Sequence, residues 1–96
     1  MNAITIASKE LGGAAQVARS LGISAPAVHQ WIAGSREVPP DRCPAIERAT
    51  GGAVTVDQLR PDVRWHRGPD PDWPHPDGRP TIDVAAPKLD AQRAAA

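Results

Sequence analysis

The chain has 96 residues, which is enough for one small domain. Its 11 Lys and Arg residues balance 11 Asp and Glu residues, so any interface for nucleic acid must come from a local face rather than from overall charge. Phe and Tyr are absent, which disfavours an all-β fold. A single cysteine, no long apolar run and no signal peptide predict a cytoplasmic protein with no membrane contact.

Two helices are predicted at the start of the chain. Residues 3–11 place apolar side chains at helical spacing and are followed by Gly12 and Gly13. Residues 14–21 repeat this pattern and are followed by Gly22. Glycine is common just past the end of a helix, because it adopts the left-handed conformation there without strain.

A third helix is predicted from Ser24 to Gly34. Ser24 is a good N-cap, and Pro26 is tolerated in the first turn, where its missing N–H removes no helical hydrogen bond. Val28 and Trp31 are the main members of its apolar stripe. We expect this stripe to face the core.

Two shorter helices complete the predicted domain. The fourth is expected to begin near Asp41, because a start at Pro39 would place Pro44 in the helix interior at a cost of roughly 3 kcal/mol. The sequence Thr-Val-Asp-Gln at residues 55–58 has the form of a capping box, so it should open a short fifth helix that contains Leu59. Five short helices with tight connections predict a small all-α domain.

The composition changes after residue 68. Five prolines occur between residues 69 and 80, and each one fixes the backbone and removes a hydrogen-bond donor. Residues 69–96 carry five acidic and three basic groups, so they would repel an anionic partner such as a nucleic acid. We therefore predict a domain over residues 1–68 and a disordered tail over 69–96 that is needed neither for folding nor for binding such a partner. An ordered tail stays open as the alternative, because four apolar residues could dock on the domain or on a second protein: Trp73, Ile82, Val84 and Leu89.

The most informative spacing joins the second and third helices. Ala18 supplies a small residue for a steep helix crossing, and Gly22 supplies positive φ in the turn. Val28 and Trp31 anchor the next helix. This spacing is typical of a helix-turn-helix, whose second helix, the recognition helix, enters the DNA major groove. An ordinary αα-hairpin within a helical bundle has a similar pattern and stays open as an alternative.

Two stretches resemble known DNA-binding proteins. LGGAAQVARSLGISAPAVHQWIAG resembles the lambda repressor and Cro class of helix-turn-helix proteins. REVPPDRCPAIERATGGAVTVDQLRPDV is similar to the small YdaS-like family of Cro-type phage regulators and proposed antitoxins. The resemblance covers residues 3–64 and implies a five-helix, lambda-repressor-like domain. Many repressors of the class have Gln near the start of the second helix, where this chain has Ala14, so main-chain N–H groups would have to bind phosphate there.

The helix-turn-helix hypothesis assigns DNA contacts to the recognition helix and to nearby arginines. Gln30 suits bidentate hydrogen bonding to adenine, and alanine methyls suit the thymine methyl. His29 has a donor for a base or a phosphate, and Arg36 lies just beyond the helix, in reach of the DNA backbone. The alternative is an ordinary solvated polar face. The predicted DNA-binding residues are Ser24, Ala25, Pro26, Ala27, His29, Gln30, Arg19, Arg36 and Arg42.

These patterns predict a Cro-type repressor that occupies a double-stranded DNA operator as a homodimer. The dimer surface is expected around Ile46, Val54, Val56 and Leu59, unless these residues form the core. Two alternatives stay open: an antitoxin-like protein that contacts a protein partner through its tail, and an interaction adaptor that does not bind DNA. No catalytic set, metal-ligand spacing or cofactor motif is visible, so neither an enzyme nor a cofactor is predicted.

Overall fold

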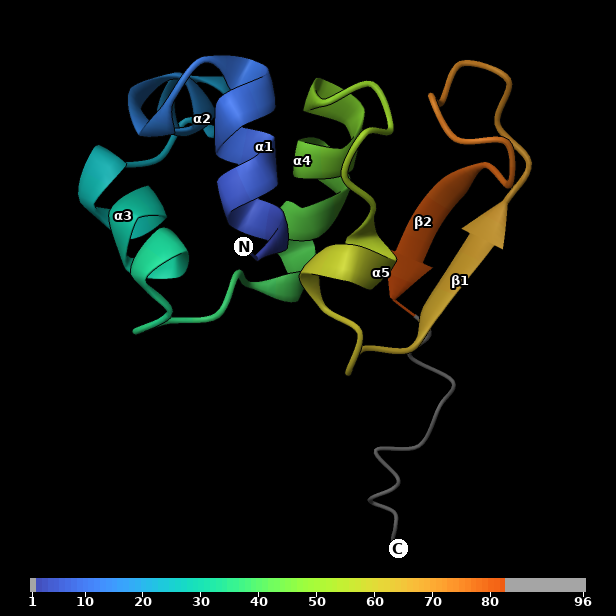
Figure 1. Ribbon diagram of the computed structural model, residues 1–96. Helices are drawn as coiled ribbons and strands as arrows, with labels where there is room; N and C mark the ends of the chain where they lie inside the picture. Colours follow the sequence, from blue (N-terminus) through green and yellow to red (C-terminus); the bar gives the residue numbers. More distant parts are fainter. Residues whose placement is uncertain (1, 83–96) are drawn as a thin grey trace, which may run out of the picture.

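Figure 1 shows the computed structural model, which describes residues 2–82. Helices α1 (Ala3–Leu11), α2 (Ala14–Leu21) and α3 (Ala25–Ala33) come first along the chain. A 3-10 turn at Pro40–Arg42 leads into α4 (Cys43–Ala49) and α5 (Val56–Leu59). Strands β1 (Trp65–Gly68) and β2 (Arg79–Ile82) form a hairpin on the far side of the molecule from α3. In the described part of the chain, no helix is long and apolar enough to cross a membrane.

Local capping explains where the helices begin. The Ser24 side chain accepts a hydrogen bond from the Ala27 N–H at 3.3 Å, as the sequence predicts for the N-cap of α3. The predicted capping box also forms at α5, where Thr55 and Gln58 exchange bonds of 3.3 and 2.9 Å. The fourth helix starts at Cys43, which keeps Pro44 within its first turn.

The helices enclose one apolar core. Ile46, Val54 and Val56 are 0%, 1% and 0% exposed, so these three residues belong to the core and are not available as a dimer surface. Leu59 is half-buried and packs against the same cluster. Buried residues come from all five helices and the linkers: Ile4, Ala7, Val17, Ala18, Val28, Trp31, Val38, Cys43, Ile46, Val54 and Val56.

The β-hairpin corrects the all-α prediction. Its antiparallel register pairs Trp65 with Ile82 and Gly68 with Arg79. Pro80 lies within β2, opposite Arg67, and proline is tolerated there because both strands of a two-stranded ribbon are edges. A four-residue strand has little local signal, and this hairpin depends on contacts with the helices.

The proline-rich run packs on the helices, which corrects the expected boundary at residue 68. Trp73 is 8% exposed, and its indole N–H donates to the Glu47 carboxylate at 2.6 Å. The Pro74 carbonyl lies so close to Gly52 that a Cβ at that glycine would clash with it. Ordering this proline-rich segment costs conformational entropy. The burial of the Trp73 indole and its hydrogen bond to Glu47 offset that cost. The rest of the predicted tail, residues 83–96, lies outside the described residues.

Glu47 holds the hairpin, α4 and α5 together. Its carboxylate is fully buried and accepts two bonds from the Arg67 guanidinium, at 2.9 and 2.6 Å. It also accepts from the Trp73 indole and, at 3.0 Å, from the Val56 N–H at the start of α5. Burial by itself raises the pKa of this carboxyl, but the bonds from Arg67, Trp73 and Val56 outweigh it and leave the pKa lowered.

This lowered pKa predicts a loss of stability in acid. A carboxyl whose pKa is lower in the folded than in the unfolded state stabilises the fold above its unfolded pKa of about 4.3. That contribution is lost as the pH falls through the folded pKa. We expect urea denaturation between pH 7 and pH 2 to show this loss for the wild type. Glu47→Gln should be less stable at pH 7 but should lose less on acidification. Parallel curves for the two chains would contradict the prediction.

Candidate nucleic-acid interface

Helices α2 and α3 are joined by the tight turn that the spacing predicts. Gly22 has φ of 69°, and its N–H bonds to the carbonyls of Ala18 and Arg19. The Ile23 N–H also bonds to the Ala18 carbonyl, at 3.0 Å. Val17 and Val28 are fully buried between the two helices and the rest of the core. The α2–α3 pair is therefore held in place by contacts on its core-facing side.

The outer face of α3 carries the predicted base-reading residues. His29 and Gln30 are exposed, on the side opposite the buried Val28 and Trp31. At the N-terminal end of the helix, Ser24 and Pro26 are exposed, whereas Ala25 and Ala27 are half-buried. All six residues therefore lie on α3 or at its N-cap, and the two alanines are less exposed to solvent than the other four.

Arg19 lies exposed on α2 and is held by a residue that the sequence prediction missed. Its Nε donates to the side-chain oxygen of Gln16 at 2.9 Å. Gln16 is exposed in the first turn of α2, two positions after Ala14. The i, i+3 spacing of Gln16 and Arg19 was a usable signal, because residues at that spacing lie side by side on a helix.

The other two predicted arginines lie in different settings. Arg36 is exposed after the end of α3, and its main-chain N–H bonds to the Gln30 carbonyl at 3.3 Å. Arg42 is half-buried, and its guanidinium donates to the Leu21 carbonyl at the end of α2, at 3.4 Å. The structure does not bring Arg42 to the outer face of α3, and its visible role is to cap α2.

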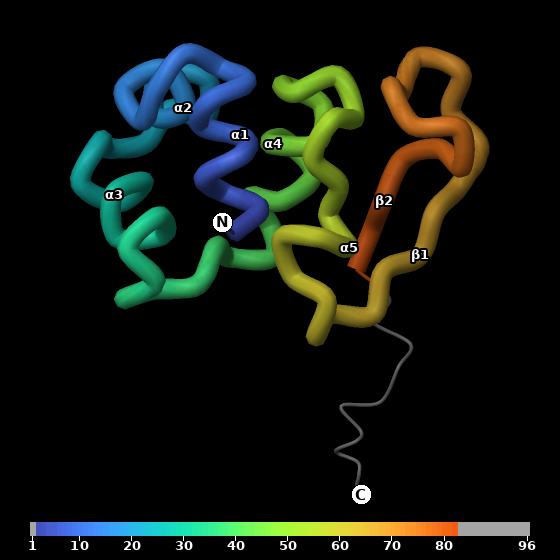
Figure 2. The backbone as a smooth tube through the Cα atoms, in the orientation of Figure 1, coloured from blue at the N-terminus to red at the C-terminus, as the bar shows by residue number. Residues whose placement is uncertain are grey.

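A further arginine, Arg60, fixes the linker that follows α3. Its guanidinium donates to the Val38 carbonyl at 2.9 Å and to both Asp62 oxygens at 2.8 and 2.7 Å. The hydrogen bond to Asp62 raises the pKa of Arg60, because it favours the charged form of the guanidinium. The backbone trace shows this linker passing by the start of α1 on its way to α4 (Figure 2). No local sequence pattern revealed this contact across 22 residues.

Comparisons with known proteins show which sequences and folds this chain resembles. The Cro protein from a proposed prophage element of Xylella fastidiosa strain Ann-1 matches with a TM-score of 0.62 and 48% identity, over 67% of this chain and 97% of that one. An Escherichia coli (strain K12) protein, named as a candidate transcriptional regulator, YdaS, is 56% identical over 55 residues. These residues are 57% of this chain and 56% of the relative, so the chain matches little more than half of that relative's length. The family profile described as "Bacterial toxin YdaS" matches residues 4–68, and the chain therefore belongs to the YdaS family.

Proposed function

We propose that this protein is a sequence-specific DNA-binding transcriptional regulator of Cro type. The observation that carries the proposal is the exposed polar face of α3, held on a packed helix-turn-helix. The similarity to a Cro protein and to a regulator supports it, and it favours a role without catalysis.

The proposed division of labour follows the chemistry of the side chains. Gln30 reads adenine through its paired donor and acceptor, and His29 donates to a neighbouring base. The small residues at the N-terminal end of α3, including Ala25 and Ala27, lie against thymine methyls and the groove wall. This set has no Lys or Arg, so the phosphate contacts come from outside α3.

Phosphate contacts are proposed for Arg19 and Arg36, which are the exposed members of the predicted arginine set. Gln16 orients Arg19 through its 2.9 Å hydrogen bond. Arg42 contributes indirectly, because it secures the end of α2 next to the turn. At the start of α2, Gly13 provides no side-chain cap, which leaves main-chain N–H groups for phosphate.

The mechanism we propose is steric repression by a homodimer. One recognition helix of this size reads only a few base pairs, whereas two copies read half-sites about one helical turn apart. Occupation of the operator then blocks polymerase. Selection of bound fragments from random duplex DNA tests this proposal, and recovery of a palindrome supports it. Uniform weak binding would instead point to an adaptor that does not recognise DNA sequence.

A second candidate function is a role in a toxin–antitoxin pair. The description of the family as a bacterial toxin favours it, as does the acidic C-terminal segment 69–96 as a contact for a protein partner. Expression of the chain in cells, with growth as the readout, separates a toxin from a regulator. Co-purification of one stoichiometric partner protein supports the antitoxin-like alternative.

Base readout by α3 gives a direct prediction. Gln30→Ala and His29→Ala should each lose about 1–3 kcal/mol of discrimination between the selected operator and a scrambled duplex, because each removes one base contact. Titration of both duplexes at a fixed salt concentration measures this difference. His66→Ala is the matched control, since His66 is exposed on β1, away from α3. Unchanged discrimination in both α3 variants would show that this helix does not read the operator.

A further inference from the structure

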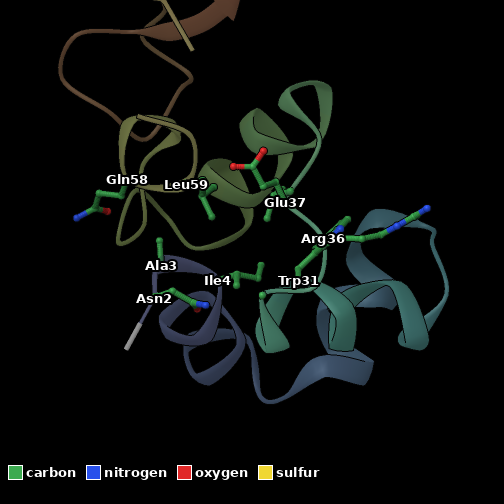
Figure 3. Close-up of a pocket in the computed structure, with 10 residues that line it drawn as sticks. Asn2, Ala3, Ile4, Trp31, Arg36, Glu37, Gln58 and Leu59 are labelled. Carbon is green, nitrogen blue, oxygen red and sulfur yellow. The ribbon is translucent and has the colours of Figure 1, made fainter. Parts of the chain in front are cut away.

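A pocket of about 190 Å³ lies beside the recognition helix, between the first turn of α1, the linker after α3, and α5 (Figure 3). Its floor is apolar, with Ile4, Trp31 and Leu59 turned toward it. Its rim is polar and includes Arg36 and Glu37. At this size the pocket holds a side chain rather than a typical small-molecule ligand.

Beyond the residues that line the pocket, α1 exposes a large apolar side chain. Ile6 is 40% exposed, which makes it one of two large hydrophobic residues that are exposed in the described part of the chain. It lies one helical turn beyond Asn2 and Ala3, which line the pocket. This surface therefore offers both an apolar projection and an apolar recess.

The rim of the pocket carries adjacent opposite charges. The Glu37 side chain is 77% exposed and lies 3.6 Å from Arg60, whose closer partner is Asp62 at 2.7 Å. Arg36 is exposed and makes no ion pair with any of the carboxylates in residues 2–82. Both groups are available to a charged partner.

The surface is also held in place before any partner binds. Arg60 holds the linker through the Val38 carbonyl at 2.9 Å. The Asn2 side chain donates to the Ile32 carbonyl in the last turn of α3 at 3.4 Å. A preorganised surface loses less conformational entropy on association.

We propose that a second copy of this chain docks on this surface through a twofold axis, with Arg36 of each subunit opposite the partner's Glu37. A guanidinium has five N–H donors, so Arg36 can bind that carboxylate and still donate to a DNA phosphate. A twofold interface brings one patch against itself, so a patch with neighbouring positive and negative groups is self-complementary. Ile6 and the apolar floor supply the desolvated centre. The proposal rests on the proposed function, because it identifies the dimer surface that operator binding uses.

The position of the surface suits this purpose. It adjoins the C-terminal end of α3 and leaves His29 and Gln30 uncovered. Association here joins the two recognition helices rigidly through the linker that carries Arg36. This surface takes the place of the dimer surface predicted from the sequence, because Ile46, Val54 and Val56 are buried in the core.

Charge reversal tests the proposed pairing without DNA. Sedimentation of the full chain over a range of concentrations should show a dimer. Arg36→Glu alone and Glu37→Arg alone should each raise the dimer dissociation constant about tenfold or more, because each places like charges opposite one another. An equimolar mixture of the two variants should recover association, since the two neighbouring acidic side chains of the Arg36→Glu chain then face the two neighbouring basic side chains of the Glu37→Arg chain. No recovery in the mixture would overturn the pairing.

A matched pair of apolar sites tests the centre of the interface. Ile6→Lys should raise the dissociation constant by roughly a hundredfold, as expected for a residue at an interface centre. Ile82→Lys is the control, because Ile82 is 39% exposed but lies at the end of the hairpin. Equal thermal midpoints for the two variants would show that both fold. Equal effects on association would overturn the assignment of this surface.

The oligomeric state on DNA separates this inference from the proposed function. Sequence-specific binding of one chain per duplex overturns the docking surface and keeps the regulator. A dimer that responds to these substitutions but binds no DNA keeps the surface and overturns the regulator. A wild-type chain that is monomeric at all concentrations, both free and on DNA, overturns the surface.

Discussion

Arg67→Ala should lower the free energy of unfolding by about 3–5 kcal/mol, because it removes the cation that neutralises a buried carboxylate. Glu47 is fully buried, and the Arg67 side chain is 11% exposed, so water replaces little of the lost interaction. Arg67 also donates to the Gly78 carbonyl at 2.9 Å, next to the start of β2. Its loss therefore weakens both the ion pair and the hairpin.

Urea denaturation at pH 7 measures this effect, and two further variants make the result specific. Arg64→Ala is the control, since Arg64 is exposed and makes none of the ion pairs found in residues 2–82. The double variant Arg67→Ala with Glu47→Gln should be more stable than Arg67→Ala alone, because it no longer buries an unpaired charge. An Arg67→Ala chain as stable as Arg64→Ala would contradict this prediction.

Trp73→Ala should cost about 3–5 kcal/mol of stability, as expected for the loss of a buried aromatic side chain. Trp73 packs between the hairpin and α4, and the guanidinium carbons of Arg48 and Arg79 lie 5.7 and 5.3 Å from its ring centroid. Its indole also supplies one of the hydrogen bonds to Glu47. Trp73→Phe keeps most of the apolar surface but loses the donor, so it should fall between the wild type and Trp73→Ala.

Shortened chains give a second measurement of the same contact. A chain that ends at Gly68 loses Trp73 and β2, and its thermal midpoint should fall well below that of the full chain. A chain that ends at Ile82 keeps the contacts between the hairpin and the helices and serves as the control. Equal midpoints for the three chains would mean that the hairpin contributes nothing to stability.

The candidate DNA interface was largely predictable because its signals are local. The N-cap Ser24, the turn residue Gly22 and the apolar anchors Val28 and Trp31 all lie within one short stretch. Together they determine where α3 begins and which of its faces is buried, and the exposure of its polar residues follows from that. The same reasoning assigned Arg42 to the interface, because spacing along the chain does not reveal its contact with the end of α2.

Local patterns were enough to predict the five helices, the N-caps Ser24 and Thr55, and the outer face of α3, because these depend on residues only a few positions apart. The packing of the proline-rich segment on the helices could not be predicted in this way, because it depends on contacts between distant residues. Glu47 meets Arg67 and Trp73 across 20 and 26 residues. Proline does restrict the backbone and remove donors, but it does not prevent an extended chain from packing. The buried Glu47 carboxylate requires hydrogen-bond donors, and Trp73 of the proline-rich segment supplies one. The burial of Glu47 follows from the packing of α4 and cannot be predicted from the local sequence.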